Sequence, residues 1–203
     1  MCVFIIQYLT EEYVDEFIAL DQQVYSTEYQ VDKMVTLERL RQNPYTDLIV
    51  TDGKHLVGYL SLCPISPVVY QNIIHGVISE QEIEKHVISY KKMGYYDVYL
   101  SSIVINKKRY PHFTSQLLFQ CLEQHLSLLR KRGIFIRYIL GVAVSIAGGK
   151  TLQKMYFHEI KENVFVYACR KQGIRFFHTH MCKITYDIPN KDGVKAIFSW
   201  GSV

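Results

Sequence analysis

Apolar residues recur along the chain at two spacings, one typical of strands and the other of helices. A short apolar run at residues 3–9 predicts a first strand. Over residues 10–25 the apolar side chains return every three or four positions, and this spacing predicts an amphipathic helix. A second helix is predicted over residues 31–42. It ends near Asn43 and Pro44, because the residue before a proline disfavours the helical conformation.

Two strands separated by a tight turn are predicted over residues 47–62. The dipeptide Asp52-Gly53 between them is typical of a hairpin. The strand signal then stops. Residues 67–76 follow neither spacing, so we expect an irregular or partly extended segment there.

A helical insert is predicted next. Ser79 and Glu82 have the spacing of a capping box, in which the glutamate side chain reaches back to the start of the helix. An apolar stripe follows, and Gly94 is a typical C-terminal stop. We interpret residues 66–94 as an insert between strands, within a single domain that spans residues 1–203.

The second half of the chain alternates strands and helices. A strand over residues 96–105 precedes a helix that runs to about Arg132, and a buried strand follows over residues 134–144. Residues 145–160 are predicted to hold a glycine-rich loop and then a helix. Two further strands and a tail without a regular pattern complete the chain, at residues 164–170, 176–186 and 187–203.

This order of elements predicts the fold class. The central strand–helix–strand unit implies a right-handed crossover and a local parallel pair of strands. The hairpins imply antiparallel pairs. We therefore expect an α/β fold with a mixed, mostly antiparallel central sheet, a parallel β-α-β core and helices on both faces.

Composition narrows the function classes. The chain has 203 residues, 49% of them hydrophobic and 13% aromatic, which suits one full-sized core and argues against disorder. No apolar run reaches the ~18 residues that a membrane span needs, and the start lacks the basic flank of a signal peptide. Five scattered cysteines without a CxxC motif do not suggest a disulfide framework, so a reduced, cytoplasmic location is expected.

The net charge is mildly positive, at +4 with histidine neutral. A charge of this size is compatible with an anionic ligand but does not call for nucleic acid. Neither a nucleic-acid partner nor a membrane is therefore expected. One basic cluster, Lys107-Lys108-Arg109, directly follows the strand predicted at residues 96–105.

That cluster lies in a strand–loop–helix junction, residues 102–118, with the sequence SIVINKKRYPHFTSQLL. The first N–H groups of a helix are unpaired and carry a partial positive charge, which suits a phosphate group. Loops that hold phosphates are often rich in glycine, because glycine permits close approach of the ligand. This loop has none, and Pro111 has no N–H to donate. The alternative is an ordinary basic turn, with Thr114 capping the helix.

The element order, together with this junction, resembles the GNAT superfamily of acyl-CoA N-acyltransferases over about residues 3–187. The signature of that family is a strand, then Gln or Arg, two residues, Gly, any residue, and Gly or Ala before a helix. Arg109 stands at the first of these positions, and His112 and Thr114 stand where the family has its small residues. The resemblance implies an enzyme that binds acetyl-CoA and passes the acetyl group directly to an amine of an unidentified acceptor.

The same resemblance implies a set of cofactor-binding residues. The main chain of Ile103 and Val104 is expected to hold the thioester carbonyl and the pantetheine amide. Lys150, beside a pair of glycines, is a candidate phosphate ligand. The pyrophosphate is expected to bind at the junction, where the candidate residues are Arg109, Tyr110, His112, Phe113, Thr114 and Ser115.

Two residues are candidates for proton transfer. Many members of the family carry a tyrosine after Leu or Met that protonates the departing CoA thiolate, and here Tyr156 follows Met155. The alternative for Tyr156 is simple packing on a helix face. A carboxylate on the strand before the loop often serves as the base, and Asp97 is the candidate. Strand alternation places Asp97 on the face opposite to Ser102 unless a bulge intervenes.

Two other interpretations stay open. His178 and His180 lie two positions apart on one strand face, but spacing gives no third ligand, so no metal is expected. The missing glycines of the family signature are compatible with a non-catalytic protein of the same fold. Such a protein would bind CoA or another anion, or serve as an interaction module.

Overall fold

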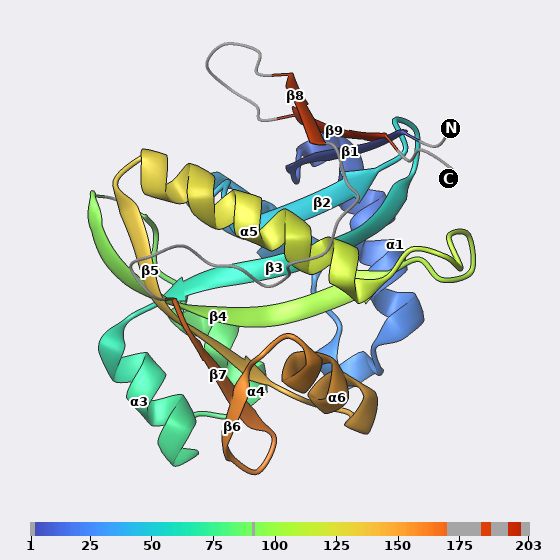
Figure 1. Cartoon of the computed structure of the whole chain (residues 1–203). Helices are drawn as coiled ribbons and strands as arrows, with labels where there is room; N and C mark the ends of the chain where they lie inside the picture. The colour runs from blue at the N-terminus through green and yellow to red at the C-terminus, as the bar shows by residue number, and fades with distance from the viewer. Residues whose placement is uncertain (1–2, 91, 170–183, 188–194, 200–203) are drawn as a thin grey trace. The chain divides into compact units, whose positions relative to one another are not determined.

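The computed structural model describes residues 3–90, 92–169, 184–187 and 195–199 (Figure 1). These residues form two compact units, each assembled from separate stretches of the chain. Strands β3 and β4 and helix α5 contribute one part to each unit. The single domain that the sequence indicates stays a prediction. Unit 1 comprises the described residues of Met1–Leu60, Ile103–Cys121 and Phe177–Val203, and unit 2 those of Ser61–Ser102 and Leu122–Phe176.

Unit 1 contains both ends of the described chain. Its strands follow the order β4-β3-β2-β1-β9-β8, and the pairs β1–β2, β1–β9 and β8–β9 are antiparallel. Its elements are β1 (Val3–Tyr8), η1 (Glu11–Tyr13), α1 (Val14–Val24), η2 (Thr27–Tyr29), α2 (Lys33–Gln42), β2 (Asp47–Thr51), β8 (Ile184–Asp187), β9 (Lys195–Ser199) and parts of β3 (Leu56–Ile65), β4 (Gly94–Ile105) and α5 (Ser115–Lys131).

The helices predicted from the first apolar stripes are confirmed in unit 1. Helix α2 begins after Asp32, whose carboxylate accepts the N–H groups of Met34 and Val35 at 2.7 and 3.2 Å. The apolar face of α1 is buried, and Phe17 stacks on Tyr59 of β3 with 4.0 Å between ring centroids. The core of the unit consists of Leu9, Val14, Phe17, Leu20, Ile49, Leu56, Tyr59 and Val104.

Unit 2 contains the parallel pair. Strands β4 and β5 run parallel and are joined by α5, whereas β5–β7 and β6–β7 are antiparallel, and the order is β6-β7-β5-β4-β3. The predicted mixed, mostly antiparallel sheet with one parallel β-α-β unit is thus confirmed. The remaining elements are α3 (Pro67–His75), α4 (Glu80–Ile83), η3 (Glu84–His86), β5 (Ile134–Val142), α6 (Ile146–Lys154), β6 (His158–Lys161) and β7 (Val164–Ala168).

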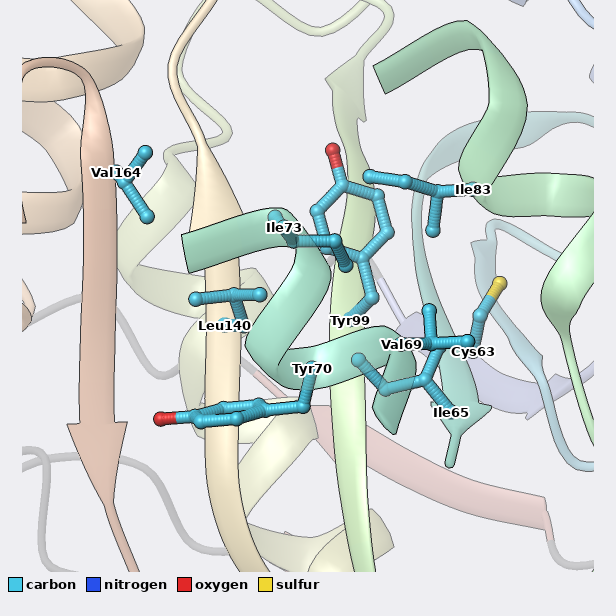
Figure 2. Close-up of a cluster of buried hydrophobic side chains, with 9 residues drawn as sticks. All are labelled: Cys63, Ile65, Val69, Tyr70, Ile73, Ile83, Tyr99, Leu140 and Val164. Atoms are coloured by element: carbon cyan, nitrogen blue, oxygen red, sulfur yellow. The ribbon is translucent and has the colours of Figure 1, made fainter. Parts of the chain in front are cut away.

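The core of unit 2 forms where α3 packs on the sheet. Figure 2 shows Tyr70 and Ile73 of this helix over the strands that carry Tyr99 and Leu140. Ile83 of α4 extends the same buried cluster. Val69, Tyr70 and Ile73 are thus the side chains by which α3 packs on the sheet.

The expectation of an irregular segment at residues 67–76 is wrong, because nine of these residues form α3. Three local signals specify the helix. Ser66 caps its start by accepting the N–H of Val69 at 3.2 Å, and Pro67 occupies the first turn, where its missing N–H costs nothing. Gly76 ends the helix in the left-handed conformation, with φ of 72°. These signals were present in the sequence, although the apolar residues of this segment do not follow a clear helical spacing.

The return contact from Glu82 to Ser79 is confirmed, but the Ser79 hydroxyl donates to the Glu82 carboxylate instead of capping the helix, and the helix is shorter than expected. The Glu82 carboxylate accepts the Ser79 N–H at 3.1 Å and the Ser79 hydroxyl at 2.7 Å. Helix α4 nevertheless ends at Ile83, and one 3-10 turn follows. Val87 then forms a bridge with Ile65 instead of continuing a helical stripe.

The glycine-rich loop predicted before the next helix is also wrong, since Gly148 and Gly149 lie inside α6. Ser145 caps the helix by accepting the Gly148 N–H at 3.1 Å. The helix stops at Lys154, earlier than expected, and residues 158–161 form strand β6. The serine cap sets the start of α6 ahead of both glycines.

The tail was expected to have no regular pattern, but Lys195–Ser199 forms β9 and pairs with β1 and β8. Main-chain pairing with β1 and β8 makes this segment a strand. A short apolar run with flanking glycine and serine is not enough to predict that strand from the sequence. Of the strand predicted over residues 176–186, the structure describes only Ile184–Tyr186, within β8 (Ile184–Asp187). His178 and His180 lie outside the described residues.

Candidate functional site

The candidate anion site in unit 1 is the β4–α5 loop, residues 106–114. Two turns give the loop its shape without glycine. Asn106 accepts the Tyr110 N–H on its carbonyl at 2.8 Å and the Arg109 N–H on its side-chain oxygen at 3.1 Å. The Phe113 N–H donates to the Tyr110 carbonyl at 3.1 Å. These three amides are therefore used inside the loop.

Other main-chain N–H groups at this junction do not donate to an acceptor inside the loop. Among the described residues, no hydrogen-bond acceptor lies at the N–H groups of His112, Thr114, Ser115 or Gln116. Ser115 and Gln116 begin α5, and Thr114 directly precedes it. The first N–H groups of a helix point outward along its axis. The donors available to an anion are thus concentrated at the start of the helix.

The cations of the loop divide into two kinds. The Lys107 ammonium donates to the carbonyl oxygens of Phe113 at 2.5 Å and of Pro111 at 3.2 Å. Lys108 and Arg109 are exposed, and within the described part of the chain neither side chain has an ion-pair partner. Lys107 is therefore engaged within the loop, whereas its two neighbours are available to a ligand.

Aromatic side chains attach the loop to β1. Phe113 is 5% exposed and meets Phe4 edge to face with 5.3 Å between ring centroids. Tyr110 also contacts Phe4, with 6.3 Å between centroids. Because the Phe113 ring points into the core, its bulk does not obstruct the open side of the loop. The ring of Phe113 is therefore not available to a polar ligand, and its N–H and carbonyl are already bound inside the loop.

A hydrogen bond joins the loop to the β2–β3 turn. The Tyr110 hydroxyl donates to an Asp52 carboxylate oxygen at 2.6 Å. Burial, reinforced by this bond, raises the pKa of Tyr110. Burial opposes the charge on Asp52, but the bonds from Tyr110, His55 and Lys54 outweigh it and lower the pKa of that carboxyl group.

Ile103 and Val104, the predicted main-chain ligands, lie in the last part of β4. The Val104 side chain is buried in the core of unit 1. Gly58 of β3 approaches its carbonyl so closely that an added Cβ would lie 2.6 Å from the Val104 oxygen. Only glycine fits at this close approach of the two strands.

In unit 2, Tyr156 follows α6 in an unusual conformation. Its φ is 63°, which is uncommon for a residue other than glycine, and its side chain is 60% exposed. Among the described residues its hydroxyl has no hydrogen-bond partner. Tyr156 does not pack on a helix face, so that alternative is wrong. Lys150 is exposed on α6.

Asp97, the candidate base, is held by a residue that sequence reasoning missed. Arg137 donates to both oxygens of the carboxylate, at 3.0 and 2.6 Å, and Asp97 is 3% exposed. The β4–β5 register shifts here, so that Arg137 is an extra residue without a partner on β4. The two residues are forty positions apart, and a β-bulge brings them together.

Sequence comparisons and structural comparisons give different results. No family model matches the sequence, and no curated protein matches it. An acetyltransferase of the GNAT family from Staphylococcus aureus Mu50 matches with a TM-score of 0.53 and 14% identity, covering 81% of this chain and 98% of that one. The chain has the GNAT fold.

Two further structures agree with that result. FeeM, an N-acyl amino acid synthase from uncultured soil microbes, matches with a TM-score of 0.55 and 12% identity over 81% of this chain and 89% of its own. A chain of the NatC complex bound to Gag peptide and CoA matches with a TM-score of 0.51 and 13% identity over 96% of both chains. The resemblance seen in the sequence is thus confirmed at the level of the fold.

Two searches of the described residues bear on other kinds of site. No helix there is long and apolar enough to cross a membrane. No group of three or more His, Cys, Asp and Glu side chains is arranged there to hold a metal ion.

Proposed function

We propose that the protein is an acyl-CoA-dependent N-acyltransferase, with acetyl-CoA as the donor and an amine as the acceptor. One observation carries the proposal: a loop without glycine still leaves the N–H groups of Thr114, Ser115 and Gln116 available beside two exposed cations. A helix start of this kind suits a pyrophosphate. The NatC structure, which shares the fold, contains CoA, and this supports the same class of ligand here.

The proposed reaction is direct transfer. The amine nitrogen attacks the thioester carbonyl carbon, the C–N bond forms, the C–S bond breaks, and the thiolate takes a proton. Tyr156 is the proposed donor of that proton, since its hydroxyl is exposed and unpaired among the described residues. The main chain of Ile103 and Val104 is proposed to polarise the thioester carbonyl.

Asp97 is the proposed base for the proton that the amine loses. Its carboxylate already accepts two hydrogen bonds from Arg137, one on each oxygen. Both oxygens of the proposed base are therefore already engaged by the guanidinium. This ion pair favours the second candidate function, a GNAT-fold protein without catalysis that binds CoA or another anion, or serves as an interaction module.

Acetyl-CoA at about 100 times its Kd is expected to raise Tm by about 5–10 °C, because a ligand of the native state stabilises it by mass action. Differential scanning fluorimetry measures the shift. Acetyl-pantetheine, which lacks the phosphates, is the control and should give a much smaller shift. An unchanged Tm at millimolar acetyl-CoA would contradict the proposed function.

Tyr156→Phe is expected to lower kcat about 10- to 100-fold while Kd for acetyl-CoA stays the same. The loss falls short of the largest general-acid effects because a thiolate is already a good leaving group. Release of free CoA thiol with a panel of amines measures turnover. Tyr95→Phe removes a hydroxyl from another exposed tyrosine of unit 2 and serves as the control. Equal turnover in both variants would remove Tyr156 from the mechanism.

A reduced, cytoplasmic location is proposed on the state of the cysteines. Among the described residues, Cys63, Cys121 and Cys169 are not joined in disulfides. Burial raises the pKa of Cys169 to about 12, so the reactive thiolate is scarce at neutral pH. Cysteines that are not joined in disulfides are typical of proteins in reducing compartments.

A further inference from the structure

Lys107 occupies a place in the loop that a glycine-rich sequence would not need to fill. Its ammonium contacts the carbonyl oxygens of Pro111 and Phe113, the two residues on either side of His112. A main-chain carbonyl carries partial negative charge, so one that faced the ligand would repel a phosphate. By drawing both oxygens to one cation, Lys107 keeps that negative charge away from a bound anion.

The loop has two other attachments, and neither replaces this one. The Phe113 ring is anchored against Phe4, and the Tyr110 hydroxyl is bound by Asp52. These contacts fix one side chain and the middle of the loop. The Phe113 N–H is held by the Tyr110 carbonyl, whereas the carbonyl oxygens of Pro111 and Phe113 are held by the Lys107 ammonium.

We propose that Lys107 is a positioning residue for the anion site: it fixes the loop carbonyls so that the N–H groups of Thr114 to Gln116 face the pyrophosphate of CoA. Lys108 and Arg109 are the cations that contact the ligand directly. The inference rests on the proposed function. It explains how a loop that has no glycine and contains a proline can still present main-chain N–H donors to a ligand.

Lys107→Gln and Lys108→Gln form a matched pair, because each removes one positive charge from adjacent exposed positions. In the free protein, hydrogen–deuterium exchange of residues 106–117 is expected to rise about tenfold in Lys107→Gln and to stay at the wild-type rate in Lys108→Gln. Lys107→Arg, which keeps the charge and its donors, should restore most of the protection.

Binding gives the second readout. Titration calorimetry should show Kd for acetyl-CoA raised about tenfold in Lys107→Gln, as the loss of charge-assisted hydrogen bonds predicts. The smaller affinity for acetyl-pantetheine, which lacks the pyrophosphate, should be the same in both variants and in the wild type. Lys107→Arg should recover acetyl-CoA affinity together with protection from exchange.

The outcomes separate the inference from the function on which it rests. If wild-type protein does not bind acetyl-CoA at all, the proposed function fails and the positioning role fails with it. If wild-type protein binds but Lys107→Gln exchanges like Lys108→Gln, only the positioning role is overturned, and Lys107 is then a direct ligand or a bystander. Faster exchange with unchanged Kd would also overturn it.

Discussion

Asp47→Asn is expected to lower the free energy of unfolding by about 3–5 kcal/mol, the usual cost of breaking a buried ion pair by changing one partner. Arg39 of α2 donates to both carboxylate oxygens of Asp47 at the start of β2, each at 3.1 Å. Only 6% and 1% of the two side chains are exposed. The amide of an asparagine would turn a donor toward the guanidinium and remove the negative charge that lies directly against it.

Urea denaturation followed by circular dichroism measures this effect. The control is Asp15→Asn, which breaks the ion pair between Lys33 and Asp15, whose side chains are 51% and 79% exposed. Water screens that pair, so its loss is expected to cost less than about 1 kcal/mol. If both variants lost the same free energy of unfolding, burial of the Arg39–Asp47 pair would not determine how much the pair contributes to stability.

The contrast between α1 and α3 shows what the sequence could and could not predict of the fold. In α1 the apolar residues repeat at three-to-four spacing, and the buried Val14, Phe17 and Leu20 follow that spacing. In α3 the exposed Val68 interrupts the period, so only the caps at Ser66 and Gly76 mark the helix. A search for caps as well as periods finds α3 and places the start of α6 correctly.

The sequence prediction missed strand β9 for a different reason. It pairs with β1, and Phe4 lies opposite Phe198, almost two hundred positions along the chain. Such a pairing depends on main-chain hydrogen bonds between distant segments. A short stretch such as Lys195–Ser199 does not carry enough local pattern to predict it.

In the candidate site, too, the local features were predictable from the sequence and the long-range contacts were not. The frame of β4, the loop and α5 was predictable, because it is local in sequence and places Arg109, His112 and Thr114 at the family positions. The contacts that shape it were not. Asp52 is 58 positions from Tyr110, and a bulge that no local rule predicts brings Arg137 to Asp97. The sequence therefore identified the candidate loop, whereas the contacts of its charged and polar side chains required the structure.

His125 is expected to make the protein lose stability in acid. It lies on α5, is 1% exposed, and its pKa is lowered to about 3 by burial and, to a smaller degree, by Arg132. The ordinary value is 6.5. Because the folded pKa is the lower one, the folded state binds fewer protons than the unfolded chain between these values. The stabilisation is thus complete above about pH 6.5 and is lost as pH falls toward 3.

Near pH 4.5 the loss amounts to about 3 kcal/mol, since about two pKa units separate that pH from the ordinary histidine value at about 1.4 kcal/mol per unit. His125→Gln removes the titration, so the free energy of unfolding of this variant, relative to its own value at neutral pH, should fall less in acid. Urea denaturation at a series of pH values measures the difference between the two curves.

The pKa of Asp21 shifts in the opposite sense, because burial raises it, but Asp21 contributes equally to both proteins and its effect cancels. His112→Gln removes an exposed histidine and should follow the wild-type curve. If His125→Gln also follows that curve, His125 is not neutral and buried in the folded state, because a neutral buried histidine must take up a proton when the chain unfolds in acid.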